Sequence, residues 1–272
     1  MTPARCSVHT HADLCDGTNT LEEMAAAAYG AGVRYYGVSC HSHTPIPEDE
    51  GFVLPADLTQ YKKAVLDLRR MYAGRMEVLL GLEWDSQSDT APTGLDYWIG
   101  SVHSLRCGGK YYALDWCEER LAACRDEAFG GDALAMAEAY FREVCRVAAL
   151  RPTILGHMDL ITKLNGDGRF FDESHPRYRA AAREALHQAD PQATLLEINT
   201  GGMARGYREV PYPALFLLKE WRDLRGRIIL SSDAHSADAI LYGYEEAAAL
   251  ARAAGFQSSV LLTAAGPREA GL

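Results

Sequence analysis

The chain has 272 residues, of which 48% are hydrophobic and 24% charged, and its formal net charge at pH 7 is −10. Such a composition is typical of a globular protein with a sizeable core. The negative charge argues against a basic surface for nucleic acid, and no apolar run approaches the roughly 18 residues of a membrane span. Neither a nucleic acid nor a membrane is therefore expected as a partner, and the oligomeric state stays open.

The seven cysteines are odd in number and include no Cys-x-x-Cys pair, which favours reduced thiols. Cys6 and Cys15 are expected to be buried structural thiols. Residues 1–5 lead straight into an expected strand and lack the apolar core of a signal peptide. Together these features predict a cytoplasmic protein.

Short apolar stretches recur along the chain, as expected for parallel strands that are covered on both faces. A further stretch, residues 257–263, is either an eighth strand or a terminal packing segment. The expected strands are residues 5–9, 35–41, 76–83, 97–103, 153–157, 193–199 and 227–233.

Helical patterns lie between these strands. Thr20 and Glu23 have the spacing of a capping box, which predicts a helix start. Pro213 suits the first turn of a helix that runs to about residue 224, and Gly255 is a natural left-handed end for the last helix. The remaining helices are expected over residues 58–72, 133–150, 177–188 and 244–254.

The alternation of strand and helix, repeated about seven times, predicts an α/β fold with a parallel sheet. An open sheet collects its site mainly at one switch point, whereas a barrel brings all its strand ends to one rim. Candidate functional residues follow six different strands, so the sequence favours a closed barrel. No linker or short repeat interrupts residues 1–272, which are expected to form a single domain.

Residues of the types that bind metal ions follow the ends of these strands, and seven of the nine histidines lie in or beside such positions. A lone His-x-His is a weak signal, and core hydrogen bonds can explain any single pair. Repeated strand ends that all deliver imidazoles or carboxylates indicate one shared metal site instead. The candidate ligands are His9, His11, Asp16, His41, Glu83, His103, His157, Asp233 and His235.

Residues two apart on a strand face the same way, so His9 and His11 can bind one ion together, and Asp233 and His235 repeat that spacing. Glu83 is expected to bridge two ions, because one carboxylate can bind two cations. Nine ligands suit two or three divalent ions, and imidazole with carboxylate suits Zn, Mn or Fe. Such a cluster can acidify a bridging water and hold both oxygens of a displacement at phosphorus.

Substrate contacts are expected mainly from the loop after the strand at 193–199. Its glycines allow close approach of the backbone, and its arginines can bind phosphate. A solvated loop is the alternative, and local hydrogen bonds explain His43 equally well. Three acids that follow His41 can reach a positively charged group of a substrate, although solvated carboxylates are the simpler interpretation; they are Glu48, Asp49 and Glu50. The expected contacts are Asn199, Arg205, Arg208, Lys163 and His43.

The order of these motifs resembles the polymerase and histidinol phosphatase (PHP) superfamily, and within it the monofunctional histidinol-phosphatases. The metal motifs are specific to the superfamily. The Ile-Gly-Ser-Val-His and Glu-Ile-Asn-Thr-Gly blocks point, less strictly, to the histidinol-phosphatase branch. The matching blocks span nearly the whole chain and are residues 9–17, 41–45, 81–83, 96–103, 156–160, 197–201 and 231–235.

The resemblance implies a distorted (β/α)7 barrel of the PHP type with two or three metal ions. The implied ligand sets are His9, His11, Glu83 and Asp233 for one ion, Glu83, His103 and His157 for the second, and Asp16, His41 and His235 for the third. Glu83, Asp233 and His235 would act in catalysis with a metal-bridging hydroxide. The implied reaction is hydrolysis of L-histidinol phosphate to L-histidinol and phosphate, in histidine biosynthesis.

The chain departs from the family pattern at two positions. Cys40 stands where relatives often have an aspartate, and Thr162 stands where an arginine is common. The first change is expected to alter metal affinity or preference without removing a ligand. If that arginine contacts phosphate in relatives, Lys163 or Arg205 must take its place here.

Three other functions remain open. A PHP-type phosphoesterase can act on another small phosphate ester or a nucleotide, which a panel of esters would distinguish. A metal-dependent amidohydrolase also begins its barrel with His-x-His, but it typically uses one or two metals and often a modified lysine. A non-enzymatic binding module is disfavoured, because all nine ligand positions are filled.

Overall fold

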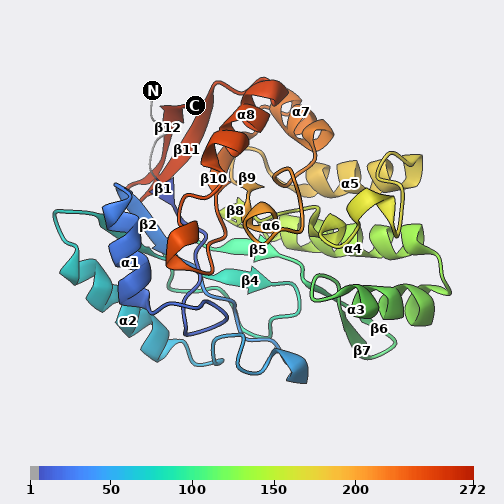
Figure 1. The fold of residues 1–272 in the computed structure, drawn as a ribbon, viewed down its shortest axis with the longest axis horizontal. Coiled ribbons are helices and arrows are strands. Elements are labelled where there is room, and N and C mark those ends of the chain that lie inside the picture. The colour runs from blue at the N-terminus through green and yellow to red at the C-terminus, as the bar shows by residue number, and fades with distance from the viewer. Residues whose placement is uncertain (1–5) are drawn as a thin grey trace.

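The computed structural model describes residues 6–272, and its main strands form two parallel sheets (Figure 1). The first contains β1 (Cys6–Ser7), β2 (Tyr35–Val38) and β3 (Glu77–Leu80), in that order. The second contains β10 (Arg227–Ser231), β9 (Leu195–Asn199), β8 (Ile154–Leu155), β5 (Ile99–Ser101) and β4 (Glu83–Asp85), in that order. The interpretation of residues 1–5 as a lead into a strand, without a signal peptide, lies outside the described residues.

Two backbone bridges join the sheets into a ring. Thr10 pairs with Ala234 beyond β1 and β10, and His41 pairs with Glu83 beyond β2. The strands β3 and β4 share one position of the ring, because β3 pairs with β2 and β4 pairs with β5. The eight strands therefore occupy seven positions, all with parallel neighbours, as expected for a distorted (β/α)7 barrel.

A break at Gly81 and Leu82 corrects the single strand expected over residues 76–83. The first half ends at Leu80, and the second begins at Glu83. The break lets Glu83 pair with Ile99 of β5 while its amide still donates to Ser39 O, at 3.2 Å, at the end of β2. Glu83 thus lies at the seam between the two sheets.

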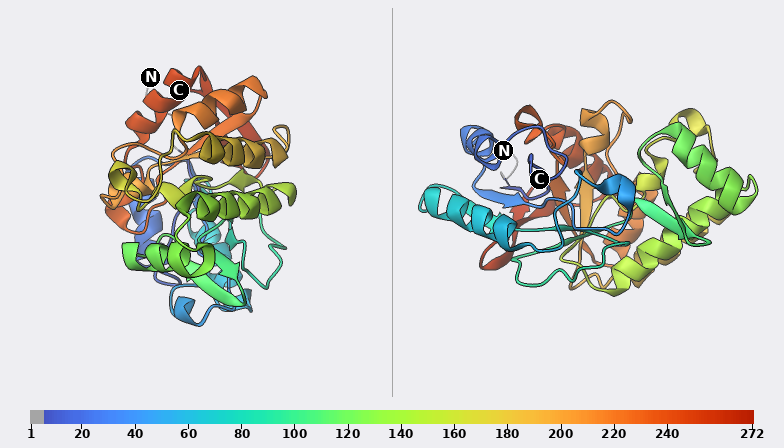
Figure 2. Two further views of the ribbon diagram at one scale, coloured as in Figure 1. Left: turned by 90° about the vertical axis from the view of Figure 1, so that its right-hand side faces the viewer. Right: turned by 90° about the horizontal axis from the view of Figure 1, so that it is seen from below.

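Helices cover the outside of the ring (Figures 1 and 2). Thr20 and Glu23 form the predicted capping box, and Gly255 ends the last helix with φ of 97°. Pro213 lies before α7 rather than in its first turn, because the helix begins at Leu215 with Ala214 as its cap. No helix within residues 6–272 is long and apolar enough to cross a membrane. The covering helices are α1 (Leu21–Gly30), α2 (Thr59–Met71), α4 (Ala133–Ala149), α5 (Pro176–Gln188), α7 (Leu215–Asp223) and α8 (Tyr244–Ala254).

Several elements lie outside the predicted pattern. Residues 86–98 connect β4 to β5 without a helix. An antiparallel hairpin of β6 (Ser104–Cys107) and β7 (Lys110–Ala113) follows β5 and leads into α3 (Glu118–Ala123). The remaining short elements are α6 (Gly201–Ala204), a π-helical turn at Cys124–Ala128, and 3-10 turns at Pro47–Asp49, Leu160–Thr162, Gly166–Gly168 and Ala237–Ala239.

A second hairpin settles the alternatives for residues 257–263. The strand β11 (Ser258–Thr263) pairs antiparallel with β12 (Gly266–Gly271), so it is a terminal packing segment rather than an eighth barrel strand. Its apolar side chains pack in one cluster with Cys6, Ile154 and Leu195, which begin their strands. The hairpin therefore lies at the amino-terminal end of the ring, away from the strand ends that carry the candidate ligands.

The close approach of Tyr97 to Gly81 generates a stability prediction. A Cβ at Gly81 would lie 2.1 Å from Tyr97 Cζ. We expect Gly81→Ala to lower the free energy of unfolding by about 1–3 kcal/mol, because the methyl group overpacks a buried ring. Chemical denaturation measures the change. Gly30→Ala is the control, since no described atom outside its chain neighbours and the backbone of its own helix lies within 4 Å of the added carbon; an equal loss there would contradict the explanation.

Candidate metal centre

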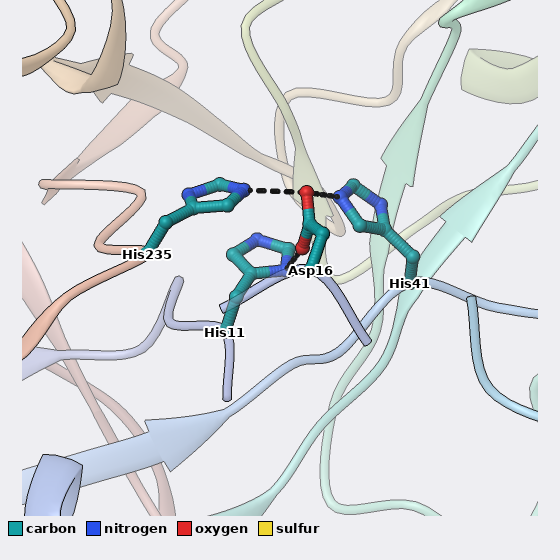
Figure 3. Close-up of side chains that lie close together, drawn as sticks. All are labelled: His11, Asp16, His41 and His235. Atoms are coloured by element: carbon teal, nitrogen blue, oxygen red, sulfur yellow. Dashed lines mark hydrogen bonds and ion pairs between the residues drawn. The ribbon is translucent and has the colours of Figure 1, made fainter. Parts of the chain in front are cut away.

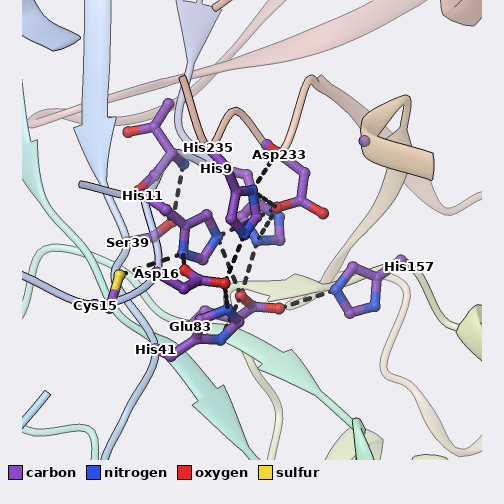
Figure 4. Close-up of polar contacts among 12 residues, drawn as sticks. His9, His11, Cys15, Asp16, Ser39, His41, Glu83, His157, Asp233 and His235 are labelled. Atoms are coloured by element: carbon purple, nitrogen blue, oxygen red, sulfur yellow. Dashed lines mark hydrogen bonds and ion pairs between the residues drawn. The ribbon is translucent and has the colours of Figure 1, made fainter. Parts of the chain in front are cut away.

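All nine candidate ligands meet at the carboxyl-terminal rim of the ring, and Figure 4 shows most of them. They form four overlapping groups in which the ligand atoms lie within 4.8 Å of one another. Three follow β1 (His9, His11 and Asp16), His41 follows β2, Glu83 begins β4, His103 follows β5, His157 follows β8, and Asp233 and His235 follow β10. The candidate ligands, which the sequence places on six different strands, therefore lie together at one rim.

Glu83 lies between two sets of imidazoles. Its Oε2 atom is 3.1 Å from His9 Nε2 and 3.3 Å from His11 Nε2. Its Oε1 atom is 2.9 Å from His157 Nε2 and 3.3 Å from His103 Nε2. The two oxygens of one buried carboxylate thus face separate sets of nitrogens, which is the arrangement that a bridging ligand requires.

Asp233 completes the first set. Its Oδ1 atom lies 3.5 Å from His9 Nε2 and 3.2 Å from His11 Nε2. Asp233 also has a φ of 49°, a left-handed conformation that is uncommon for a residue other than glycine. Strained backbone of this kind clusters at functional sites, where the surrounding structure holds it in place.

A third group lies beside the first (Figure 3). The Oδ2 atom of Asp16 is 3.0 Å from His235 Nε2 and 3.5 Å from His41 Nε2. His41 also links this group to Glu83, since its Nδ1 is 3.1 Å from Glu83 Oε2. This group contains Asp16, His41 and His235, the members of the third ligand set that the family resemblance implies, and His11 lies close to Asp16 as well.

The donor atoms at the centre of the cluster fit divalent metal ions. His9 Nε2, His11 Nε2 and Glu83 Oε2 are buried, and although they lie close together they make no well-aligned hydrogen bond within residues 6–272. Leaving buried polar atoms unpaired costs about 1–3 kcal/mol each, and coordination to a cation removes that cost. Imidazole nitrogens with carboxylate oxygens are the donors that Zn, Mn and Fe accept. The cluster can therefore hold several divalent ions.

The electrostatics of the cluster also favour a bound cation. Burial alone would lower the pKa of His9, but Glu197, Asp233 and Glu83 together raise it well above its ordinary value. Burial alone would raise the pKa of Glu83, but His9, His41 and His103 together lower it. The carboxylates are thus held ionised, and cations that bind there would displace protons from the histidines.

Three further side chains orient the histidines, and the sequence analysis assigned them no such role. Glu197 Oε1 lies 2.6 Å from His9 Nδ1, and Asp85 Oδ2 lies 2.8 Å from His103 Nδ1. Cys15 Sγ lies 3.6 Å from His11 Nδ1. In each case the second ring nitrogen, Nε2, is left to face the cluster, as in most histidine ligands. Spacing was the sequence signal that could have identified Asp85, because it follows the candidate ligand Glu83 by two residues on β4.

The two departures from the family pattern both lie in the protein interior. Cys40 is fully buried beside Cys15, and burial raises the pKa of its thiol. Thr162 is also buried, and its hydroxyl accepts a hydrogen bond from Arg208. Neither residue lines the cavity at the metal centre.

Only two of the five expected substrate contacts line that cavity, whose volume is about 220 Å³. Lys163 and Arg205 do so. Asn199 is buried and donates to Glu197 Oε2 at 3.0 Å, and Arg208 bonds to Thr162 with its guanidinium 4.8 Å from the Tyr212 ring centroid. His43 pairs with Asp89 at 2.7 Å instead. The structure therefore places Asn199, Arg208 and His43 outside the cavity wall.

Residues 6–201 match the PHP domain family. This chain belongs to the PHP domain family. The PHP protein is 27% identical over 267 residues to a histidinol-phosphatase of Bacillus subtilis (strain 168), an alignment that covers 87% of this chain and 96% of that protein. It is also 30% identical over 257 residues to "Probable histidinol-phosphatase" of Deinococcus radiodurans, covering 89% of this chain and 90% of the relative.

A solved structure confirms the fold of the PHP protein. It is histidinol phosphate phosphatase from Lactococcus lactis subsp. lactis Il1403, complexed with zinc, L-histidinol and phosphate. The TM-score is 0.65 at 20% sequence identity, with 98% of this chain and 100% of that chain covered. The expected distorted barrel of the PHP type is therefore confirmed, and the expected resemblance to the family is confirmed with it.

The contact between Glu197 and His9 generates a prediction about metal affinity. We expect Glu197→Gln to weaken metal binding by about 10- to 100-fold, as is typical when the partner of a ligating histidine is changed. The amide keeps the shape of the side chain but loses the charge beside His9 Nδ1. Metal content after dialysis against graded chelator measures the effect.

Asp89→Asn is the matched control for this change. Asp89 pairs with His43, which is not among the nine clustered residues, so its metal content should equal that of the unchanged protein. Retention of metal by Glu197→Gln at every chelator concentration that the unchanged protein withstands would refute the orienting role.

Proposed function

We propose that this PHP protein is a metal-dependent phosphomonoesterase that hydrolyses L-histidinol phosphate to L-histidinol and phosphate, in histidine biosynthesis. The observation that carries the proposal is the position of Glu83, whose two oxygens face separate imidazole sets beside a cavity. A polynuclear centre of this kind suits displacement at phosphorus. The names of both relatives, and the ligands of the Lactococcus lactis structure, support this substrate.

The nine ligands would hold two or three ions in the sets described above. When bound, Zn, Mn or Fe ions supply positive charge to the phosphate oxygens and make water acidic enough to attack near neutral pH. Glu83, Asp233 and His235 would serve catalysis by holding such ions. Glu197, Asp85 and Cys15 keep the rings of His9, His103 and His11 in the orientation that turns Nε2 to the cluster.

Arg205 and Lys163 are the phosphate contacts that the protein itself supplies. Arg205 Nη2 lies 3.1 Å from Asp233 Oδ2, and its Nη1 lies 3.2 Å from His235 Nδ1. Lys163 Nζ lies 3.0 Å from Asp115 Oδ2 on the cavity wall. Both cations therefore flank the metal groups, where they can bind the oxygens of a phosphate and neutralise charge that develops during hydrolysis.

We also propose that the whole chain forms one domain and that the protein is cytoplasmic. Residues 1–272 would form one domain, since β10 and the ligands Asp233 and His235 lie beyond the matched residues 6–201 yet complete the ring and the cluster. None of the seven cysteines is paired within the described residues, which suits the cytoplasm.

The direct test is phosphate release from L-histidinol phosphate, beside a small panel of other phosphate esters and a nucleotide, with enzyme loaded separately with Mn, Zn and Fe. We expect a clear preference for L-histidinol phosphate in kcat/KM. Broad and slow turnover would keep the phosphoesterase and reject the substrate. Absence of phosphate release from metal-containing protein would favour an amidohydrolase, which amide substrates would then reveal.

Removal of the shared ligand gives a second prediction. We expect Glu83→Ala to lower both bound metal and kcat by more than about 100-fold, because one substitution strips a ligand from two ions. Metal analysis and phosphate release on the same sample measure the two effects. Full metal content with full activity would rule out the bridging position.

The guanidinium of Arg205 gives a third prediction. We expect Arg205→Ala to lower kcat/KM by about 10- to 100-fold, mainly through KM, since a charged hydrogen bond contributes about 1.5–3 kcal/mol. Arg146→Ala is the control, because Arg146 is exposed on α4 and pairs with Glu143. An unchanged rate at low substrate concentration for Arg205→Ala would remove Arg205 from the site.

A further inference from the structure

The cavity beside the metal groups has an aromatic wall. Five aromatic side chains within residues 6–272 are between 43% and 48% exposed, and they are Tyr29, Phe52, Trp116, Tyr207 and Tyr242. Three of the five, Phe52, Trp116 and Tyr207, line this one cavity. Exposed apolar surface that gathers at a cavity marks a binding surface rather than chance exposure.

Phe52 and Trp116 form the wall from two separate loops. Their ring centroids are 5.1 Å apart and their planes meet at 84°. Beside Phe52, the amide of Leu54 donates to His41 O at 2.9 Å, and near Trp116 the amide of Leu114 donates to His103 O at 2.9 Å. Each side of the wall is therefore tied through the backbone to a candidate ligand, which fixes its distance from the metal groups.

Asp49 adds a negative charge to the same wall. It lines the cavity, and its carbonyl accepts a hydrogen bond of 2.9 Å from the amide of Phe52. Its carboxylate accepts a hydrogen bond of 2.5 Å from the Thr44 hydroxyl. Partial burial, together with the nearby Asp85 carboxylate, raises the pKa of Asp49. A cation bound beside it would therefore relieve an unfavourable environment.

Asp49 differs from the other carboxylates of the cavity in having no cationic partner. Asp115 is paired with Lys163, and Asp85 is paired with His103. No lysine, arginine or histidine nitrogen of the described part of the chain lies within 4.0 Å of the Asp49 carboxylate. Its neighbours Glu48 and Glu50 are exposed and do not line the cavity, so only one of the three acids in this loop can act there.

We propose that Asp49, Phe52 and Trp116 form the binding site for the alcohol portion of the substrate, and that they select an alcohol with both a flat ring and a positive charge. The inference rests on the proposed function, which places the phosphate at the metal groups. The ring packs on the indole of Trp116, and the charged amine pairs with Asp49. A nucleoside offers the ring without the cation, so it leaves Asp49 unpaired and is rejected.

Three esters separate the two parts of this site. L-histidinol phosphate carries a ring and an amine, phenyl phosphate carries a ring alone, and phosphoethanolamine carries an amine alone. For each variant, kcat/KM is divided by that of the unchanged holoenzyme with the same ester, so that differences in leaving-group chemistry cancel. The resulting three ratios show which part of the alcohol a side chain recognises.

We expect Asp49→Asn to lower kcat/KM for both amine-bearing esters about tenfold or more relative to phenyl phosphate. We expect Trp116→Ala to lower it about five- to tenfold for both ring-bearing esters relative to phosphoethanolamine. Glu48→Gln and Tyr242→Ala are the matched controls, since both residues lie outside the cavity wall and should leave all three ratios near one.

An equal loss with all three esters, or no change in selectivity, would overturn the proposal, because either result means that these side chains do not recognise the alcohol. Failure of the proposed function has a different signature, which is the absence of phosphate release from every ester by the unchanged holoenzyme. Calorimetric titration with L-histidinol would then decide the inference. We expect Kd to rise about tenfold or more in Asp49→Asn, and equal affinity, or no binding to the unchanged protein, would refute it.

Discussion

Closure of the barrel and convergence of the candidate ligands are one physical constraint. One closing bridge joins Thr10, which lies between His9 and His11, to Ala234, which lies between Asp233 and His235. The other joins His41 directly to Glu83. A slip of one residue at either seam would turn these side chains to the opposite face, since the side-chain period of extended backbone is two. The register that closes the ring is thus also the register that assembles the cluster.

The clustering of the candidate ligands was predictable because they are ionisable groups at the ends of apolar strands, where burial without a partner is unfavourable. Their orienting partners were not, because Asp85 and Glu197 resemble ordinary strand residues until it is known which ring nitrogen each one meets. The six covering helices and most barrel strands followed from periodicity and capping. The β6–β7 hairpin was missed although its signal was present, since Gly108 and Gly109 both have positive φ, as a two-residue hairpin turn requires.

The loops were the least predictable part of the site. Nothing in the sequence relates Phe52 to Trp116, and their contact depends on the separate backbone bonds that tie each loop to its histidine. The same limit explains Arg208, whose position in a glycine-rich loop fits phosphate binding, whereas the fold directs its guanidinium to Thr162 and Tyr212. Residue type and spacing identify which groups can act, but the partners that compete for them become visible only in three dimensions.

The order of the candidate ligands along the chain decides at which stage of synthesis each proposed metal site can be completed. The first set needs both His9 and Asp233, and the third needs both Asp16 and His235, so neither is complete on the ribosome until β10 has been synthesised. Only the second set, Glu83, His103 and His157, has all its members before β10, but the ring around it stays open until Ala234 pairs with Thr10. With these sets as the metal ligands, we expect a nascent chain to compete poorly for metal ions and loading to follow closure of the ring. The ions available at that stage, rather than during translation, would then decide which metals the finished protein carries.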